Sequence, residues 1–335
     1  MTATLAQLAQ RPLSSDDMAA AMEQIIGGQA PAQDVEEFLR TLAARGETAE
    51  EIAAVVASLW RHAVPLRLSK PLELCDTCGT GGDGQGTFNI STLAAIVAAA
   101  CGVRIAKHGN RAASSRCGSA DVLEALGFNL NATPAQVARS IETIGFGFCF
   151  APTFHPAMKA VAEVRRRLGI RTIFNLAGPL ANPAVPPLTF QLVGVSDERL
   201  MEPMAHALQK LSIRHGLVVH GADGLDEVTT TGETRAVEIP SGKTIRVSPV
   251  EYGLPRATLH QLRGGDAAAN AAIAHEVLSG APSPKRDIVA LNAGCVIYTA
   301  DQAQTIEQGI AQAIDALESG RARTVLERAI AMSQA

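Results

Sequence analysis

The sequence predicts an α/β fold in which a small, all-helical N-terminal unit precedes a larger unit with a mostly parallel sheet flanked by helices. Residues 1–64 place apolar side chains only at helical spacing. From about residue 70, short apolar runs alternate with helical stretches, as in parallel sheets covered by helices. The chain of 335 residues is long enough for two units. We place them at 1–68 and 69–335, and expect part of 155–185 to pack back on the helical unit.

The N-terminal helices are marked by three apolar stripes, over residues 18–26, 35–42 and 52–59. Thr48 and Glu51 form a capping box in front of the third stripe. A unit of this size is small for an independent core, so the stripes must pack on the larger unit or on a second copy of the chain. We expect a helical unit that forms one wall of a cleft and a homodimer surface.

The larger unit is predicted from its apolar runs. The candidate strands are Leu72–Cys75, Val103–Ala106, Gly147–Phe150, Gln191–Val195, Leu217–His220 and Ala236–Ile239. Helical stretches between them include Ser91–Cys101, Ala120–Leu126, Pro134–Ile144 and Arg199–Leu211. In such sheets, ligands bind beyond the carboxyl ends of the strands. The turns at 76–91 and 107–119 each follow a candidate strand, and we expect both to face one site.

Composition excludes several classes of protein. The net charge of −4 and the pI of about 6.1 argue against nucleic acid as a partner. The longest apolar run, 93–103, has 11 residues and is too short to span a bilayer. The N-terminus lacks a charged segment followed by an apolar core, so we expect no signal peptide, no membrane partner and a cytoplasmic location.

The six cysteines show no disulfide framework. Cys75 and Cys78 have C-x-x-C spacing, but a structural zinc site would need a second pair, and the sequence has none. A redox pair is the alternative, although the motif runs directly into a glycine-rich turn. We expect reduced, structural cysteines.

The glycine-rich turn GTGGDGQGTFNIST, residues 79–92, is the first candidate site. Its start fits the dinucleotide fingerprint G-x-G-x-x-G, but further residues separate it from the next helix, and Lys107-His108 replaces the acidic residue that should hold the ribose. No Gly-Lys-Ser/Thr follows, which excludes a Walker A loop. Two interpretations remain: a plain capped turn, or a turn whose amides bind phosphate at a helix N-terminus formed by Asn89, Ser91 and Thr92.

A second candidate lies in a stretch without acidic residues. No Asp or Glu occurs in the 37 positions between Asp83 and Asp121. The stretch contains five basic residues or histidines, Arg104, Lys107, His108, Arg111 and Arg116, and three serines, Ser114, Ser115 and Ser119. Cations and hydroxyls without local anions predict a pocket for a highly charged phosphate ligand.

Two further clusters have chemistry of their own. Asp226-Glu227 offers adjacent carboxylates that suit Mg²⁺ shared with substrate phosphates, although such pairs are also common on surfaces. The three arginines at 165–167 lie on one helical turn, which is usually a solvated face. One of them turned inward would bind a carboxylate in bidentate fashion, and His155 lies just upstream.

Together these residues resemble the anthranilate phosphoribosyltransferase family, over about residues 70–295 and with a fitting helical N-terminus. The motifs that match in order are DTCGTGGDG, NIST, KHGNRAASS, GSADVLEALG, RTIFNLAGPLANP and DGLDEVT. Ala177 departs mildly, because a larger aliphatic residue is expected there.

The resemblance implies a fold of the nucleoside phosphorylase and phosphoribosyltransferase kind, with a hinged helical domain and a homodimer. It implies transfer of phosphoribose from phosphoribosyl pyrophosphate to the amino group of anthranilate, with Mg²⁺. The residues implied to bind phosphoribosyl pyrophosphate are Gly79, Gly82, Asp83, Thr87, Asn89, Ile90, Ser91, Thr92, Lys107, Ser115 and Ser119. Those implied to bind anthranilate are Gly79, Asn110, His155, Arg165 and Gly178. Lys107, His108 and Asn110 would be catalytic, and Ser91, Asp226 and Glu227 would bind Mg²⁺.

Two alternatives stay open at this point. A pyrimidine nucleoside phosphorylase shares the general architecture but lacks the pairing of GTGGDG with NIST. A non-catalytic, nucleic-acid-binding relative of the same fold is disfavoured by the acidic pI and by the intact Asp226-Glu227 pair.

Overall fold

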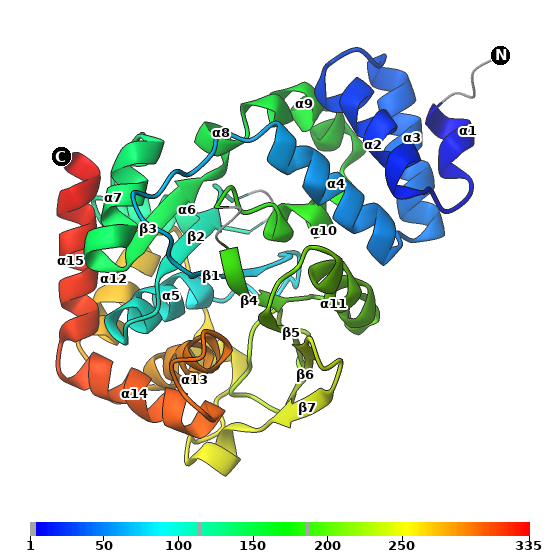
Figure 1. Ribbon diagram of the computed structural model, residues 1–335. Coiled ribbons are helices and arrows are strands. Elements are labelled where there is room, and N and C mark those ends of the chain that lie inside the picture. The colour runs from blue at the N-terminus through cyan, green and yellow to red at the C-terminus, as the bar shows by residue number, and fades with distance from the viewer. Residues whose placement is uncertain (1–4, 113–114, 185–187) are drawn as a thin grey trace.

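The computed structural model describes residues 5–112, 115–184 and 188–335. At one end of the molecule lie the N-terminal helices, α1 (Leu5–Ala9), α2 (Ser15–Ile26), α3 (Ala32–Arg45) and α4 (Ala49–Arg61) (Figure 1). The predicted capping box is present: Thr48 accepts a hydrogen bond from the Glu51 N–H, and Glu51 accepts one from the Thr48 N–H. It fixes the start of α4, the helix that faces the larger unit.

The apolar stripes of these helices are buried within the single chain. Met18, Phe38 and Ile52, one from each stripe, are fully buried. Helix α4 packs on α10 and α11, and α2 and α3 pack on α9. Among the described residues, Ile170 and Val250 are the only large hydrophobic side chains exposed to solvent. The stripes therefore pack on the larger unit, and their burial requires no second subunit.

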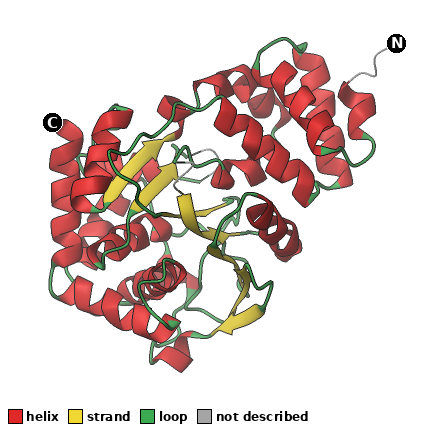
Figure 2. Cartoon of the chain, in the orientation of Figure 1, coloured by secondary structure: helices red, strands yellow, loops and turns green. Residues whose placement is uncertain are grey.

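The larger unit is built on a seven-stranded sheet of order β3-β2-β1-β4-β5-β6-β7, drawn yellow in Figure 2. The strands are β1 (Leu74–Gly79), β2 (Ile105–Gly109), β3 (Phe146–Phe150), β4 (Leu188–Gly194), β5 (His215–Gly221), β6 (Thr234–Ile239) and β7 (Thr244–Val247). Strands β1 to β5 are parallel, and β6 and β7 are antiparallel additions at one edge. Six strands were predicted; β7 is short and exposed at this edge and has little apolar pattern.

Two cores lie on the two faces of the sheet because side chains alternate along each strand. In β5, Leu217 and Val219 face the core formed with α5 (Ile90–Ala100) and α13 (Pro284–Thr299), whereas Val218 faces the core shared with the N-terminal helices. The remaining helices are α6 (Ser119–Ala125), α7 (Pro134–Ile144), α8 (Ala151–Phe154), α9 (Lys159–Leu168), α10 (Ile173–Leu180), α11 (Met201–Lys210), α12 (Ala267–Leu278), α14 (Ile306–Glu318) and α15 (Arg321–Gln334).

Two expectations from composition can be compared with this fold. All six cysteines are free, and four of them are buried, as expected for reduced, structural residues. Within the described residues, no helix is both long enough and apolar enough to cross a bilayer.

Candidate active site

The candidate site lies where β1, β2, β4 and β5 end. These parallel strands finish at Gly79, Gly109, Gly194 and Gly221, so their carboxyl ends lie along one side of the sheet, which is called the carboxyl edge below. The glycine-rich turn leaves β1 at this edge, and the Asp226-Glu227 pair follows β5. Both turns predicted to face one site thus begin at the same edge, as expected for parallel strands.

The glycines of the turn are required for two reasons, one conformational and one steric. Gly81, Gly82, Gly84 and Gly86 all have positive φ, between 66° and 79°, a region that side chains disfavour. Gly79 has a different role, since a Cβ there would overlap the Asp226 carboxylate. The turn is therefore shaped to bring its backbone against an acidic residue of the loop that follows β5.

The Asp226-Glu227 pair holds this turn from the side of β5. The Asp226 Oδ2 accepts a hydrogen bond of 2.6 Å from the Gly81 N–H. The Glu227 Oε1 accepts one of 3.1 Å from the Ser91 N–H in the first turn of α5. The pair is consequently not a surface feature: it connects the end of β5 to both ends of the glycine-rich turn.

Negative charge is concentrated at this point. Burial, then repulsion by Asp83, raises the pKa of Asp226 well above its usual range. Burial, then repulsion by Asp226, raises the pKa of Glu227 to about 8. These carboxylates lack enough local positive charge, and a divalent cation would supply it. Asp83, whose charge acts on both Asp226 and Glu227, also lies near the position where such a cation would bind.

The donor set fits Mg²⁺ bound together with phosphate. Over 5–112, 115–184 and 188–335, no three His, Cys, Asp or Glu side chains converge to hold a metal by themselves. Mg²⁺ usually binds through one or two carboxylates plus water and substrate phosphates, so a site with few protein ligands is suitable. The oxygen-only chemistry of the residues at this site agrees with that choice.

Lys107, on β2 beside β1, is almost fully buried. Its Nζ donates a 2.7 Å hydrogen bond to the carbonyl of Thr77 on β1. Its charge lowers the pKa values of both Asp76 and Glu227, although burial outweighs it and leaves the pKa of Asp76 at about 6. Lys107 therefore balances two buried carboxylates, one on β1 and one in the loop after β5.

Asp76 and Asn182 form a buried polar link that sequence reasoning missed. The Asn182 amide donates to the Asp76 Oδ2 at 2.9 Å and to the carbonyl of Ala106 at 2.6 Å. The Asp76 Oδ1 accepts from the His108 N–H. The link fixes the end of β2, where Lys107 and His108 lie. The available signal was an Asp directly after a predicted strand; β1 continues through Asp76 to Gly79.

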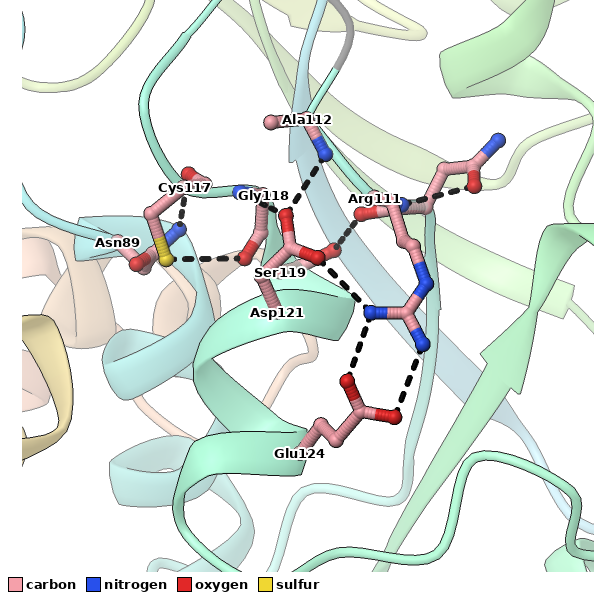
Figure 3. Close-up of polar contacts among 9 residues, drawn as sticks. Asn89, Arg111, Ala112, Cys117, Gly118, Ser119, Asp121 and Glu124 are labelled. Carbon is pink, nitrogen blue, oxygen red and sulfur yellow. Dashed lines mark hydrogen bonds and ion pairs between the residues drawn. The ribbon is translucent and has the colours of Figure 1, made fainter. Parts of the chain in front are cut away.

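The second loop is the turn at 107–119, described here without residues 113 and 114. Sequence analysis predicted a pocket lined by cations without nearby anions in this region, and two of its arginines do not fit that prediction. Arg104 donates to the carbonyl of Ile141 at the end of α7, by the start of β2 and away from the site. Arg111 pairs with Asp121 at 3.0 Å and Glu124 at 2.7 Å (Figure 3). For these two arginines the expectation was wrong, because the acids that pair with Arg111 and the carbonyls that bind Arg104 come from later segments.

Hydrogen bonds within the second loop shape it. The Asp121 Oδ2 accepts from the N–H groups of Ala112 and Gly118 (Figure 3). Ser119 donates to the carbonyl of Asn110, and Ser115 donates to that of Cys117. The serines thus stabilise the loop, and their hydroxyls still have acceptor capacity for a donor. Ser114, also named above, lies outside the described residues.

A second group of residues brings together His108, His155 and the Gly178 backbone. The two imidazole rings meet edge to face with centroids 5.2 Å apart. His155 hydrogen-bonds the carbonyl of Ala181, whereas the His108 Nε2 is buried without a partner among the described residues. Burial lowers the pKa of His108 to about 3, so this ring is neutral and weakly basic at pH 7.

Arg165 is the arginine that turns inward. Its guanidinium lies over the Phe174 ring, 5.6 Å from the centroid, and burial lowers its pKa. Arg166 is exposed, and Arg167 pairs with Glu36 on α3. No ion pair to Arg165 is formed by the described residues. Its charge is therefore available to an anionic ligand. A Cβ on Gly178 would meet open space.

Comparisons with known proteins agree with this geometry. The model of the glycosyl transferase family helical bundle domain matches residues 4–63, and that of the family's a/b domain matches residues 72–323. The chain is 48% identical over 331 residues to anthranilate phosphoribosyltransferase of Symbiobacterium thermophilum, covering 98% of this chain and 96% of that protein. It is also 48% identical to the same enzyme of Moorella thermoacetica, over 97% and 95%.

Solved structures give the same result. The anthranilate phosphoribosyltransferase of Thermus thermophilus superposes with a TM-score of 0.94 at 45% identity, covering 99% of this chain and all of that chain. The Saccharomyces cerevisiae enzyme, in complex with PRPP and Mg, has a TM-score of 0.89 at 32% identity, over 96% and 94%. The chain belongs to the anthranilate phosphoribosyltransferase family, built from the helical bundle and a/b domains of the glycosyl transferase family.

Proposed function

We propose that this chain transfers the phosphoribosyl group of 5-phosphoribosyl 1-pyrophosphate to the amino group of anthranilate, with release of pyrophosphate, in tryptophan biosynthesis. The observation that carries the proposal is the contact of Asp226-Glu227 with the glycine-rich turn. It is supported by Arg165, which is half-buried and forms no ion pair with the described residues. One part of the site suits a pyrophosphate with a divalent cation, and the other suits a carboxylated aromatic ring.

In this proposal the backbone and cations of the site stabilise a leaving group. Departure of pyrophosphate leaves positive charge on the ribose carbon, as in glycoside cleavage. The amides of the glycine-rich turn and the α5 N-terminus would hold phosphate oxygens. Ser91, Asp226 and Glu227 would bind Mg²⁺, with Asp83 adjacent. Bound there, Mg²⁺ would neutralise charge that develops on the pyrophosphate.

The amine needs positioning more than activation. An aromatic amine is already neutral at pH 7, so its lone pair is free without a strong base. Arg165 would hold the carboxylate of anthranilate, and His108, His155 and Gly178 would line the ring. The low pKa of His108 argues for a lining role over proton uptake. Asn110 is exposed at the end of β2, where it would contact the aromatic substrate.

The direct test is the fluorescence of anthranilate in the presence of phosphoribosyl pyrophosphate and Mg²⁺. Consumption of the amine should lower the signal. Omission of the protein, of phosphoribosyl pyrophosphate or of Mg²⁺ should leave the signal unchanged. A steady signal with the complete mixture, together with phosphorolysis of thymidine, would identify the chain as a pyrimidine nucleoside phosphorylase instead.

Arg165→Ala is expected to reduce kcat/KM for anthranilate about 10- to 150-fold, because a charge-assisted hydrogen bond is worth about 1.5–3 kcal/mol. The KM for phosphoribosyl pyrophosphate should change little. Arg166→Ala is the matched control, since Arg166 occupies the same helical turn but is exposed. Equal losses in the two variants would show that the assignment of Arg165 is wrong.

We also propose that the protein is a homodimer with a cytoplasmic location. The support is the family resemblance alone, because the apolar stripes are already covered within one chain. Light scattering should give about twice the chain mass of 34.9 kDa. A monomeric mass at micromolar concentration would contradict the dimer.

A further inference from the structure

Residues 262–265 form a short segment, called the strap here, that pairs with residues 86–88 in the second half of the glycine-rich turn. The Phe88 N–H donates to the carbonyl of Leu262, and the Gly264 N–H donates to that of Gly86 at 3.0 Å. Thr87 and Arg263 form an isolated antiparallel bridge between them. A Cβ on Gly264 would lie only 2.7 Å from the Phe88 Cα, so the two backbones are in close contact. The strap therefore fixes the chain just before α5.

The strap leads into α12, and α12 carries Asn270, an asparagine with 3% of its surface exposed. The Asn270 Oδ1 accepts a 2.7 Å hydrogen bond from the Gly265 N–H. Its Nδ2 donates 2.9 Å to the Oδ1 of Asn89. The Asn89 Nδ2 in turn donates 3.1 Å to the carbonyl of Cys117 in the second loop (Figure 3). One relay thus joins α12, the start of α5 and the second loop.

The relay changes what Asn89 does. Asn89 is the N-cap residue of α5, and asparagine at this position normally caps the first turn with its side-chain oxygen. Here Asn89 makes no side-chain cap, because its oxygen accepts from Asn270 and its amide donates to Cys117. The Asn89 side chain therefore caps no N–H of the first turn of α5. The N–H groups of Ile90 and Ser91 bond the Phe88 carbonyl and Glu227, which leaves the Thr92 N–H for a phosphate at this helix N-terminus.

We infer that Asn270 is a positioning residue for phosphoribosyl pyrophosphate, a role that rests on the proposed function. It holds the Asn89 side chain in the relay and away from the first turn of α5. Without the Asn270 donor, the Asn89 oxygen is free to cap that turn and to compete with a phosphate oxygen. Asn270 touches no reacting atom; it acts through Asn89.

The experiment measures binding of phosphoribosyl pyrophosphate with Mg²⁺ by calorimetry, together with both KM values and the melting temperature. Asn270→Ala should weaken binding about 10- to 100-fold, the range for groups that orient a ligand-binding residue. The KM for anthranilate should stay within about threefold. Asn131→Ala, an exposed asparagine whose side chain is outside the relay, is the control and should match the wild type.

A second variant separates positioning from folding. Asn270→Asp keeps the acceptor for Gly265 but replaces the donor toward Asn89 with an oxygen. It should fold, and it should lose affinity for phosphoribosyl pyrophosphate as Asn270→Ala does. In an Asn89→Ala background, Asn270→Ala should have little additional effect, because the residue it acts through is gone.

The outcomes separate the two proposals. Wild-type affinity in Asn270→Asp, or additive effects of Asn89→Ala and Asn270→Ala, would overturn the positioning role while the proposed function stands. A lower melting temperature with unchanged affinity would mean that Asn270 only stabilises the fold, and would also overturn it. Absence of binding and product formation in the wild type would overturn the proposed function and this inference with it.

Discussion

Replacing Asp226 with Asn and Glu227 with Gln is expected to lower kcat by about two to three orders of magnitude, the scale seen when one preorganised electrostatic contact to a transition state is lost. The same double variant should melt at a higher temperature than the wild type without Mg²⁺. Without Mg²⁺, the folded protein must either ionise these carboxylates against burial and mutual repulsion or take up protons that the unfolded chain does not bind, so neutral isosteres remove a cost of about 1–3 kcal/mol. Their acceptor oxygens remain for Gly81 and Ser91.

The dependence on pH gives this prediction a definite sign. The pKa of Glu227 is about 8 in the folded protein against 4.5 for the free side chain. The native state thus binds a proton that the unfolded state lacks between these values, and stability without Mg²⁺ should rise as the pH falls from 8 to 6.5. His108 and His155, whose pKa values burial lowers, act in the opposite direction, chiefly below pH 6.5. In the window from 8 to 6.5 the carboxylates therefore dominate the pH dependence.

The measurement is thermal unfolding of both proteins at pH 6.5 and 8, with and without Mg²⁺. The slope should be up to about 1.4 kcal/mol per pH unit for each group in the wild type and should be much smaller in the double variant. If the double variant keeps wild-type activity and the same slope of stability against pH, then Asp226 and Glu227 neither bind the cation nor cause the pH dependence of stability.

Lys107→Met is expected to destabilise the protein by about 3–5 kcal/mol, because it leaves buried carboxylates without their cation. Lys107 is nearly fully buried, and its charge offsets both Asp76 and Glu227. Affinity for phosphoribosyl pyrophosphate should fall as well, since Lys107 bonds the Thr77 carbonyl on β1, two residues before the glycine-rich turn, and its charge acts on Glu227. Chemical denaturation and calorimetry measure the two effects separately.

Lys107→Met with Asp76→Asn is the partner variant that tests this cause. The neutral amide removes the uncompensated charge on β1 while keeping the acceptor for the His108 N–H. The double variant should recover part of the lost stability but not the lost affinity. If Asp76→Asn brings no recovery, the loss comes from the cavity left by the lysine side chain, and the electrostatic explanation is wrong.

Much of the fold could be predicted from local sequence. Local residue patterns predict the apolar stripes of α2, α3 and α4, the Thr48 capping box and the five parallel strands. Each of these features depends on residues that lie close together in the chain. The edge strand β7 could not be predicted this way, because it is short and half solvated. The covering of the stripes by α9, α10 and α11 also depends on long-range contacts.

The site divides in the same way. The sequence alone marked the segments that meet at the candidate site, because glycines needed for positive φ, basic residues after a strand and an acidic pair are recognisable by residue type. Only the tertiary structure decided which charges meet. It gave Arg111 its acidic partners, placed Arg104 away from the site and turned Arg165 inward. Links through Asn182 and Asn270 join segments about 76 and 181 residues apart, and no local pattern can register them.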